Sequence, residues 1–445
     1  MRATQALPRP PGPGISSVAA LRALRRDPIA LFERAASFGD VSYVRLPGVG
    51  LYVVNDPDLV HHVLAAGDRG FRKGPTMDAA TLLLGQSLLT SSGEYHKRHR
   101  RLMQPIFHRE RITADGSTMV ELAVRARDRW HDGQPLDIHV EMAALTLAIV
   151  GRTLFASDIE TAESRDVAVA MREVLAQYER VFSPFLRLSQ HLPLPANRRF
   201  EAAKASFDRT IRTLISRRRA AGLGGHDLLS LLLRARDDEA GLTDDQVRDE
   251  ALTLFLAGHE TTANALTWTW HLLGRHPEIE RRLQAELDRV LGSREPEVGD
   301  IATLTYTGSV VAESMRLYPP AWAIGRRATE EHELGGYRVP SGAVVVVSPW
   351  LVHHDERWWP KASAFRPERW ERGADPHRHT YLPFGAGPRM CIGEDFARLE
   401  AVLLLATIAR RWRFDVDPTH AVELQPVITL RPRTGVRVTA VARDR

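Results

Sequence analysis

The only cysteine of this 445-residue chain, Cys391, lies in the segment FGAGPRMCIG at residues 384–393. A single thiol cannot form an intramolecular disulfide, and it provides too few ligands for a zinc site. A lone cysteine is most often a small buried apolar residue. Here, however, Gly385, Gly387 and Gly393 let the backbone turn tightly and approach a bulky group. This arrangement favours a thiolate that serves as the axial ligand of a planar metal cofactor.

Two neighbouring features affect the thiol of Cys391. A helical pattern begins near Glu394, and the N-terminal end of a helix stabilises a negative charge such as a thiolate. Arg389 lies two residues before the cysteine. Its guanidinium either lowers the pKa of the thiol or binds an anionic group of a ligand.

A second candidate site lies in a long and unusually apolar helical stretch. Thr243 and Gln246 form a capping box, and the helical pattern then continues without proline to His276, over roughly 48 Å. Its middle, LTLFLAGHETTANALTWTW, is apolar on most faces, so this helix should run through the core. Burying an unpaired carboxylate is costly. The presence of Glu260, beside Thr261, in so apolar a helix therefore indicates a functional role.

The elements that position these residues are mostly helical. VSYVRLPG (41–48) and LYVVND (51–56) predict two short strands, and the pattern from about 56 to 290 is mostly helical. Short strands and loops follow residue 320, then a helix over 395–412 and a β-like tail over 427–441. The fold class is therefore mainly α with a minor β portion. We expect one large domain over residues 15–445, after a proline-rich lead-in over residues 1–14.

Composition and charge exclude several classes of function. The net charge is +5 and the pI is near 9.5, but acids are interleaved with the arginines, which disfavours a nucleic-acid partner. The exception is the run HKRHRR (96–101), which is either a solvated helix face or a surface for an acidic partner. No uncharged run of roughly 18–20 residues predicts a membrane span, and no signal sequence precedes the lead-in. A cytoplasmic protein is expected.

Together these segments resemble the cytochrome P450 family. FGAGPRMCIG is similar to its haem-binding signature, AGHETT (257–262) to its oxygen-binding stretch, ESMR (313–316) to its Glu-x-x-Arg element, and FRPERW (365–370) to the element supplying a second arginine. They occur in the family's order and spacing from about residue 10 onward. The resemblance implies the cytochrome P450 fold, with one long helix over a haem b whose iron is bound by Cys391.

The resemblance also implies roles for particular residues. Glu260 and Thr261 would deliver protons through water. Glu313, Arg316 and Arg369 would form a structural network behind the haem, although a Glu–Arg pair is more often a weak surface salt bridge. The implied haem-binding residues comprise propionate-binding cations and members of the cysteine loop: His96, Arg100, Arg326, Phe384, Gly385, Arg389, Cys391 and Gly393.

The residues that would face the substrate are nearly all apolar, which suits a hydrocarbon of moderate size, although half of them are expected merely to pack the core. They are Met77, Leu82, Leu83, Leu84, Phe182, Phe185, Phe255, Ala257, Trp322, Ile324, Val427 and Ile428. Arg72, Lys73 and Arg187 lie near enough in sequence to hold a carboxylate. LPLPANRRF (192–200) and residues 325–342 resemble actinobacterial members that oxidise sesquiterpenes. A polycyclic terpene is therefore the expected substrate, with fatty acids, macrolides and other lipophiles as alternatives.

The implied activity is that of a monooxygenase, which inserts one atom of O2 into a C–H bond of a hydrophobic small molecule. The chain continues for only 54 residues after Cys391, so electrons are expected from a separate ferredoxin and ferredoxin reductase. Two alternatives are a peroxygenase driven by hydrogen peroxide and a non-enzymatic haem-binding sensor. Relatives of the first kind replace the acid–alcohol pair by an arginine. A sensor would bind haem and turn nothing over.

Overall fold

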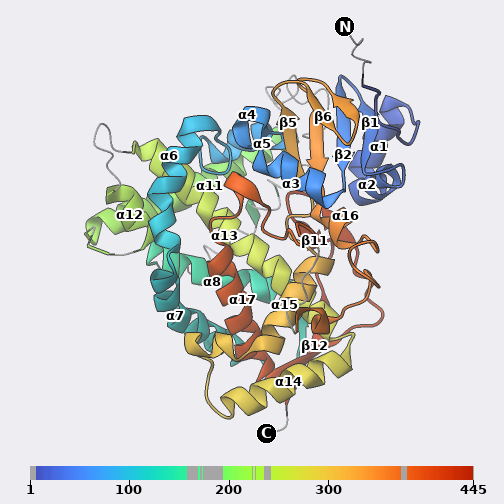
Figure 1. Cartoon of the computed structure of the whole chain (residues 1–445). Helices are drawn as coiled ribbons and strands as arrows, with labels where there is room; N and C mark the ends of the chain where they lie inside the picture. Colours follow the sequence, from blue (N-terminus) through green and yellow to red (C-terminus); the bar gives the residue numbers. More distant parts are fainter. Residues whose placement is uncertain are drawn as a thin grey trace.

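The longest described helix, α13 (Asp244–Leu273), runs through the helical part of the protein, as its apolar pattern predicts (Figure 1). The structure is a computed structural model that describes residues 7–157, 169–170, 173, 194–222, 224–225, 227–234, 242–371 and 378–443. The predicted capping box is present: Gln246 N–H donates to Thr243 Oγ1 at 3.2 Å, and Thr243 N–H donates to Gln246 Oε1 at 2.9 Å.

Helix α13 ends at Leu273, earlier than the predicted end at His276. The chain turns at Gly274, where a Cβ atom would lie 2.6 Å from the carbonyl oxygen of Phe414. Only glycine allows this close approach to strand β9 (Trp412–Val416) directly after the helix. His276 instead precedes the next helix, α14 (Pro277–Leu291), which has proline at its first position.

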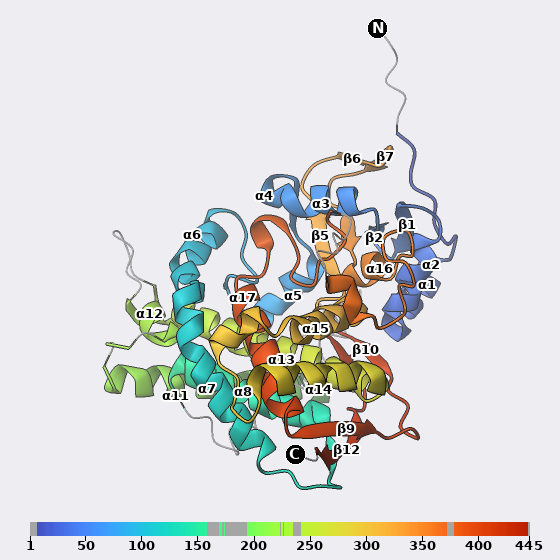
Figure 2. The same ribbon diagram turned by 60° about the horizontal axis from the view of Figure 1, so that its bottom comes forward.

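Helices α8 (Ile138–Phe155), α15 (Thr305–Leu317) and α17 (Glu394–Ala409) pack against α13 and bury its apolar faces (Figures 1 and 2). Helix α7 (Arg109–Arg127) packs in turn against α8 and α17. Of these, α8 is long and apolar enough to cross a membrane, but most of it is buried inside the fold, as in a core helix. The helix predicted over 395–412 is confirmed as α17, although it ends at Ala409 and Trp412 already belongs to strand β9.

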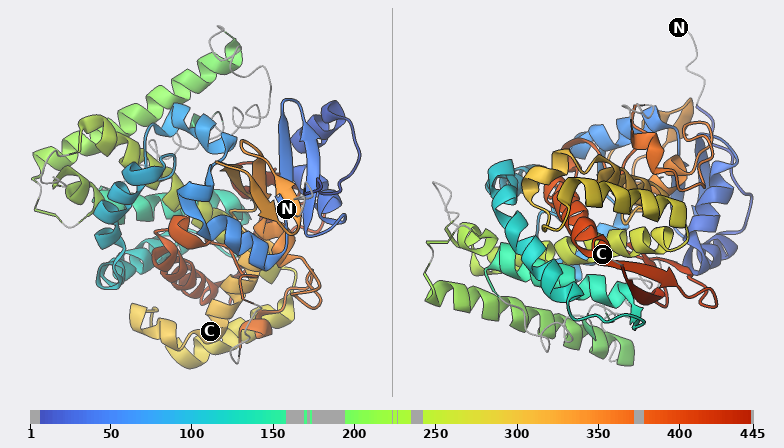
Figure 3. Two further views of the ribbon diagram at one scale, coloured as in Figure 1. Left: turned by 45° about the horizontal axis from the view of Figure 1, so that its top comes forward. Right: turned by 90° about the horizontal axis from the view of Figure 1, so that it is seen from below.

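Shorter or peripheral helices complete the helical part. The two views of Figure 3 place the long green helix α11 at the edge of the molecule, away from the blue N-terminal strands. The remaining helices are α1 (Ser17–Arg26), α2 (Pro28–Ala36), α3 (Pro57–Ala65), α4 (Gly67–Gly70), α5 (Pro75–Leu84), α6 (Gly93–Met103), α11 (Pro195–Ala220), α12 (Leu228–Arg234) and α16 (Pro349–His353), with 3₁₀ turns η1 (Gln104–Phe107), η2 (Val298–Ala302), η3 (Pro367–Trp370) and η4 (Gly387–Arg389).

A five-stranded sheet lies at one side of the molecule beside α1 and α2 (Figure 1). Its order is β1 (Val41–Leu46), β2 (Val49–Val54), β8 (Val344–Val347), β5 (Ile324–Ala328) and β3 (Phe71–Lys73). The β1–β2 hairpin confirms the two predicted strands, with Val41 opposite Val54. The sequence did not predict β3, because three residues are too few to show the alternation of a strand.

The remaining strands form three small sheets. The β-like tail pairs as predicted, although its strands belong to two different sheets. The strands are β4 (Pro135–Asp137), β12 (Arg437–Ala442) and β9 (Trp412–Val416) in one sheet, β10 (Leu424–Pro426) and β11 (Leu430–Pro432) in a second, and β6 (His332–Leu334) and β7 (Tyr337–Val339) in a third.

The described part of the proline-rich lead-in, residues 7–14, lies along strand β1. Tyr43 N–H donates to the carbonyl oxygen of Pro11 at 2.8 Å, and the Arg9 guanidinium lies 4.9 Å from the centre of the Tyr43 ring. Gly12 touches the same strand so closely that a Cβ atom would lie 1.9 Å from the Tyr43 oxygen. This part of the lead-in therefore packs against the fold.

Candidate active site

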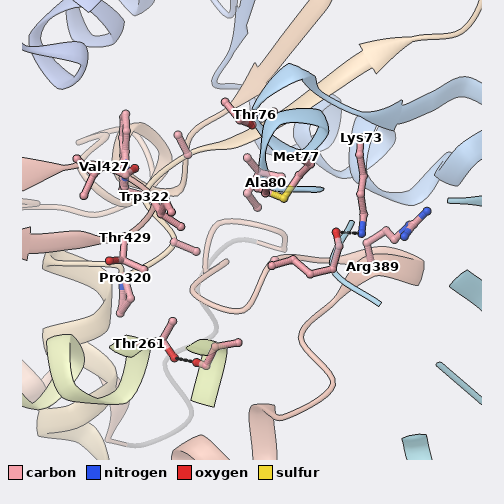
Figure 4. Close-up of a pocket in the computed structure, with 18 of the residues that line it drawn as sticks. Lys73, Thr76, Met77, Ala80, Thr261, Pro320, Trp322, Arg389, Val427 and Thr429 are labelled. Carbon is pink, nitrogen blue, oxygen red and sulfur yellow. Dashed lines mark hydrogen bonds between the residues drawn. The ribbon is translucent and has the colours of Figure 1, made fainter. Parts of the chain in front are cut away.

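A cavity of about 1860 Å³ lies between α13 and the segment that precedes α17 (Figure 4). Ligand pockets typically occupy roughly 300–1,000 Å³, so this cavity is large enough for a cofactor and a substrate together. Its walls come from α5, α6, α13, β5, the 384–393 segment and the turn between β10 and β11. The cavity therefore joins the two sites that the sequence singled out separately.

The segment around Cys391 folds as a tight loop that presents the thiol to the cavity. The Cys391 N–H donates to the carbonyl oxygen of Phe384 at 3.0 Å, and both residues line the cavity. Gly385 and Gly387 adopt left-handed conformations, with φ of 74° and 70°. A Cβ atom at Gly387 would lie 2.5 Å from the oxygen of Leu64 in α3. The close approach at Gly387 is therefore to the protein's own backbone, and not to a cofactor as expected.

The expectation that the surroundings of Cys391 lower the pKa of its thiol is wrong. Cys391 is exposed towards the cavity. The protein packed around the thiol nevertheless raises its pKa by desolvation, and this effect outweighs the Gly393 N–H and the Arg100 cation, which act in the opposite direction. Arg389 is not among the groups that lower the pKa of the thiol; one of its nitrogens donates to the carbonyl oxygen of Ser91 at 2.8 Å. Its alternative role, binding an anionic group of a ligand, stays a prediction. A metal ion deprotonates a coordinated thiol outright, so the site fits an iron–thiolate bond better than a free thiolate.

Four cations predicted to hold the haem propionates all line the cavity: His96, Arg100, Arg326 and Arg389. Arg100 shows most clearly that an anion fits there. It donates to the carbonyl oxygen of Met390 at 2.8 Å, burial lowers the pKa of its guanidinium, and no carboxylate of the described residues pairs with it. Because a half-buried cation is stabilised by an opposite charge, the donor set fits a cofactor with carboxylate groups.

The acid–alcohol pair also faces the cavity. Glu260 and Thr261 are half-buried in its wall, and Thr261 Oγ1 donates to the carbonyl oxygen of Ala257 at 2.7 Å (Figure 4). Glu260 Oε1 accepts a hydrogen bond from the Thr429 hydroxyl at 2.8 Å. The carboxylate that the sequence left unexplained therefore has a polar partner in the cavity wall.

The structure joins the three residues of the predicted Glu–Arg–Arg network. Glu313 and Arg316 are fully buried and form two hydrogen bonds, of 2.9 Å and 2.8 Å, while Arg369 Nε donates to Glu313 Oε1 at 3.1 Å. Trp370 Nε1 donates to the second Glu313 oxygen at 3.0 Å. This is a buried ion-pair network with its lone pairs filled, unlike an exposed salt bridge.

Acidic residues at the start of α13 hold the backbone of the loop that precedes α6, which we call the 85–92 loop. Asp249 Oδ2 accepts from Gln86 N–H at 2.8 Å, and Glu250 Oε2 accepts from Leu88 N–H at 3.0 Å. The other oxygen of Glu250 lies 2.6 Å from His99 Nδ1, in a pair that is almost completely buried. The loop is thereby fixed to α13 by charged groups.

Two basic residues of the cavity wall bind the same loop. The Lys73 ammonium donates to the carbonyl oxygen of Leu88 at 2.9 Å and also to that of Leu89. Arg389 reaches the carbonyl oxygen of Ser91 from the cysteine segment. Figure 4 shows Lys73 and Arg389 close together on one side of the cavity. The loop therefore connects the substrate side of the cavity with the segment that carries the cysteine.

Most of the predicted pocket residues line the cavity: Met77, Leu82, Leu83, Leu84, Ala257, Trp322, Ile324, Val427 and Ile428. Phe255 does not, because its ring is fully buried and packs edge-to-face on Phe155 at 5.7 Å in the helical core. Trp322 also packs partly in a core, stacked on Phe32 at 5.7 Å. Phe182, Phe185 and Arg187 lie outside the described residues.

Sequence reasoning missed several residues of the wall. Leu88 and Leu89 line the cavity from the 85–92 loop, and Thr429 lines it from the turn after β10. An apolar Leu–Leu pair in an otherwise polar loop, GQSLLTSSG, was the available signal for the first two. Nothing in the sequence marked Thr429, whose partner Glu260 lies far away along the chain.

Only part of the basic run at 96–101 forms a solvated face. His96 and His99 are buried, whereas Lys97 and Arg101 are exposed. Lys97 pairs with Glu94 at 2.6 Å on the surface of α6. An acidic partner would therefore meet Lys97 and Arg101 and not the whole run.

One buried carboxyl near the site has a strongly shifted pKa. Glu400 of α17 is fully buried, and neither oxygen is within hydrogen-bonding geometry of another described residue, although the Thr262 hydroxyl weakly favours its charged form. Burial raises the pKa of Glu400 to about 8. The unfolded chain releases this proton near pH 4.5 while the folded protein keeps it, so the free energy of unfolding falls as pH rises from about 4.5 to 8.

Replacing Glu400 with glutamine removes this loss. Between pH 5 and pH 7 the stability of E400Q relative to the unmodified protein should rise by about 2.5 kcal/mol. Urea unfolding at the two pH values measures the difference, and E201Q, a change at an exposed glutamate of α11, should show no such rise. An equal stability difference at both pH values would show that Glu400 ionises normally.

Comparison with known proteins agrees with this geometry. The family model for cytochrome P450 matches residues 8–436. The chain is 39% identical to cyclooctatin synthase of Streptomyces melanosporofaciens over 413 residues, covering 92% of this chain and 90% of that protein. It is 40% identical to cyclooctat-9-en-7-ol 5-monooxygenase of the same organism over 401 residues, covering 89% and 87%. It is 35% identical to pentalenene oxygenase of Streptomyces avermitilis over 425 residues, covering 94% of each.

The resemblance seen in the sequence is therefore confirmed over nearly the whole chain. The family's cofactor is a haem whose iron is bound by a cysteine thiolate, and Cys391 is the sole cysteine that can supply it. Two of the three relatives are named as a monooxygenase and an oxygenase. The chain belongs to the cytochrome P450 family of haem-thiolate monooxygenases.

Proposed function

We propose that this monooxygenase oxidises a polycyclic terpene. The observation that carries the proposal is the apolar wall of the cavity over α13, with Met77, Ala80, Trp322 and Val427 facing it (Figure 4). A wall of this kind binds a rigid hydrocarbon through buried area and shape rather than through charge. Relatives that are 35–40% identical over most of the chain act on cyclooctat-9-en-7-ol and on pentalenene.

A fatty acid has less support, because the two described cations nominated for its carboxylate, Arg72 and Lys73, are not arranged around an anion. Lys73 donates to two carbonyl oxygens of the 85–92 loop, and Arg72 is exposed and does not line the cavity. The fatty-acid alternative therefore predicts that the carboxylate binds beside Lys73 or at another cation of the wall, such as Arg327 or Arg433.

In the proposed reaction, RH, O2, two electrons and two protons give ROH and water. The haem, when bound, supplies thiolate-ligated iron that activates O2. Cys391 would hold the iron, and His96, Arg100, Arg326 and Arg389 would hold the propionates. Glu260 with Thr261 would move protons from solvent towards the cavity. The apolar wall orients the substrate and excludes bulk water.

We also propose a cytoplasmic ferredoxin and its reductase as the electron donors. The exposed cations Lys97 and Arg101 lie on α6, the helix that carries the propionate-binding residues His96 and Arg100. An acidic partner docked there would lie on the haem side of the molecule. Product formation that depends on NADH, reductase and ferredoxin would also separate the enzyme from a haem-binding sensor.

The substrate class is tested by spectral titration of the ferric protein. A tricyclic sesquiterpene hydrocarbon should convert the haem from low to high spin, because an apolar occupant displaces water from the iron side of the cavity. A medium-chain fatty acid, titrated in parallel, should produce little shift. A shift with the fatty acid alone would overturn the proposal and make Lys73 or Arg72 the candidate carboxylate anchor.

A further inference from the structure

The turn between β10 and β11 is bonded to the middle of α13. Asn264 Nδ2 donates to Thr429 Oγ1 at 3.1 Å, and Thr429 Oγ1 donates to Glu260 Oε1 at 2.8 Å. Glu260 and Asn264 are four residues apart, so they lie on the same face of the helix. Trp268, one turn further, donates to the carbonyl oxygen of Leu430 at 3.0 Å. These hydrogen bonds therefore join the turn and the start of β11 to the helix.

The direction of these hydrogen bonds follows from the chemistry of the groups. The Asn264 amide nitrogen can only donate, so the threonine oxygen accepts from it. The single hydroxyl proton of Thr429 is then left to be donated to Glu260. Both Thr429 and Asn264 are buried, so these two partners of the hydrogen-bonded set are protected from bulk solvent, while Glu260 is half-buried in the cavity wall. A hydrogen bond to a carboxylate is stronger in such a setting than in water.

The same turn also forms part of the substrate space. Val427 and Ile428 line the cavity beside Thr429, and Figure 4 shows Thr429, Val427 and Trp322 along one wall, with Thr261 of α13 further along it. Thr261 Oγ1 donates to its own helix. Because its hydroxyl is directed at a backbone oxygen, Thr261 does not itself hold the Glu260 carboxylate.

We propose that Thr429 is a positioning residue that holds the Glu260 carboxylate at the cavity wall for proton delivery. This inference rests on the proposed role of Glu260. With Thr429 in place, one carboxylate oxygen is fixed and the other is left to exchange protons with water in the cavity. Without the hydroxyl, the Glu260 side chain is free to adopt other rotamers, and protons arrive at the wrong place.

The consequence concerns how O2 is used. Well-positioned protons give RH + O2 + 2e⁻ + 2H⁺ → ROH + H2O, whereas misdirected protons give O2 + 2e⁻ + 2H⁺ → H2O2 and leave RH unchanged. Both reactions consume the same number of electrons from the ferredoxin. A loss of positioning should therefore change the ratio of product to peroxide much more than the rate of NADH oxidation.

Thr429→Val tests the inference, because valine has nearly the same shape without the hydroxyl. The ratio of product to hydrogen peroxide should fall at least about fivefold, and T429S, which restores the hydroxyl, should return it to within about twofold of the unmodified enzyme. The probe is whichever of the terpene and the fatty acid shifts the spin state in the titration above. Its dissociation constant should not change, since the hydroxyl is engaged with Glu260.

Thr269→Val is the matched control. Thr269 lies on the same helix and is buried, but its hydroxyl donates only to the carbonyl oxygen of Ala265, at 2.8 Å. The same chemical change there should leave the ratio of product to peroxide as it was. Crystal structures of the haem-loaded proteins give a readout without substrate: Glu260 should move from its place beside residue 429 in T429V only.

A double-mutant cycle with Glu260→Gln separates this inference from the proposed role of Glu260. If E260Q uncouples and T429V adds nothing to it, Thr429 acts through Glu260. If E260Q couples like the unmodified enzyme, the role proposed for Glu260 is wrong. If E260Q uncouples but T429V alone does not, only the inference about Thr429 is overturned. A weaker affinity of T429V for the probe, with unchanged coupling, would make Thr429 a substrate contact instead.

Discussion

Serine in place of Cys391 is expected to reduce product formation at least about a thousandfold, which corresponds to about 4 kcal/mol of transition-state stabilisation. The thiolate donates electron density to the iron and favours cleavage of the O–O bond, and a serine oxygen does so poorly. The reduced C391S protein with carbon monoxide should lose the spectral signature of a thiolate ligand. Product formation and that spectrum are both measured on haem-loaded protein.

The control for this change is the stability of the haem-free chain. Serine is nearly isosteric with cysteine, and the loop is fixed by backbone contacts such as the 3.0 Å bond from the residue 391 N–H to Phe384. Thermal unfolding of the two haem-free proteins should therefore coincide. A C391S protein that keeps a thiolate-type spectrum, or more than about a tenth of the activity, would show that another group binds the iron.

The second large effect is expected when Glu313 is replaced with alanine. This change leaves the fully buried Arg316 without its carboxylate and removes the acceptor of Arg369 and Trp370. Breaking one side of a buried ion pair costs about 3–5 kcal/mol. Arg316 also donates to the carbonyl oxygen of His353 at 2.7 Å. Urea unfolding at pH 7 measures the loss of stability. Haem retention shows whether the change also disturbs the cavity.

Hydrogen bonds connect the Glu313 network with the segment that carries Cys391. His353 Nε2 accepts from Leu382 N–H at 2.9 Å, just before the segment that carries Cys391. Weak haem retention is therefore expected together with the loss of stability. Glu331→Ala, at an exposed carboxylate paired with Arg338 at 2.7 Å, should change neither property. If E313A were as stable as E331A, the network would contribute nothing beyond surface pairing.

The sequence predicted those parts of the site that depend on residues close together in the chain. The capping box at Thr243, the long apolar helix and the Cys391 segment each occupy a short stretch whose residue types suffice to recognise them. Glu313 and Arg316 are likewise close in sequence, so their pairing follows from helix geometry. The start of α17 just after the cysteine follows from its apolar pattern.

What the sequence could not predict depends on contacts between distant segments. Glu250 meets His99, and Glu260 meets Thr429, only because the chain folds α13 against α6 and against the C-terminal turn. The prediction that the Phe255 side chain faces the substrate was wrong for a related reason. Helical spacing does not tell which of several apolar faces of a helix borders a cavity. The raised pKa of Cys391 depends on burial, which no local pattern gives.

The 85–92 loop has a consequence for how this enzyme can change over evolution or in the laboratory. Its charged partners form hydrogen bonds with main-chain atoms of the loop, whereas the side chains of Leu88 and Leu89 line the cavity. Single substitutions at those two leucines are therefore expected to change substrate selectivity without moving the loop backbone. A grafted loop of another length is expected to need its own anchoring residues. The design separates the variable part of recognition from the constant part of architecture.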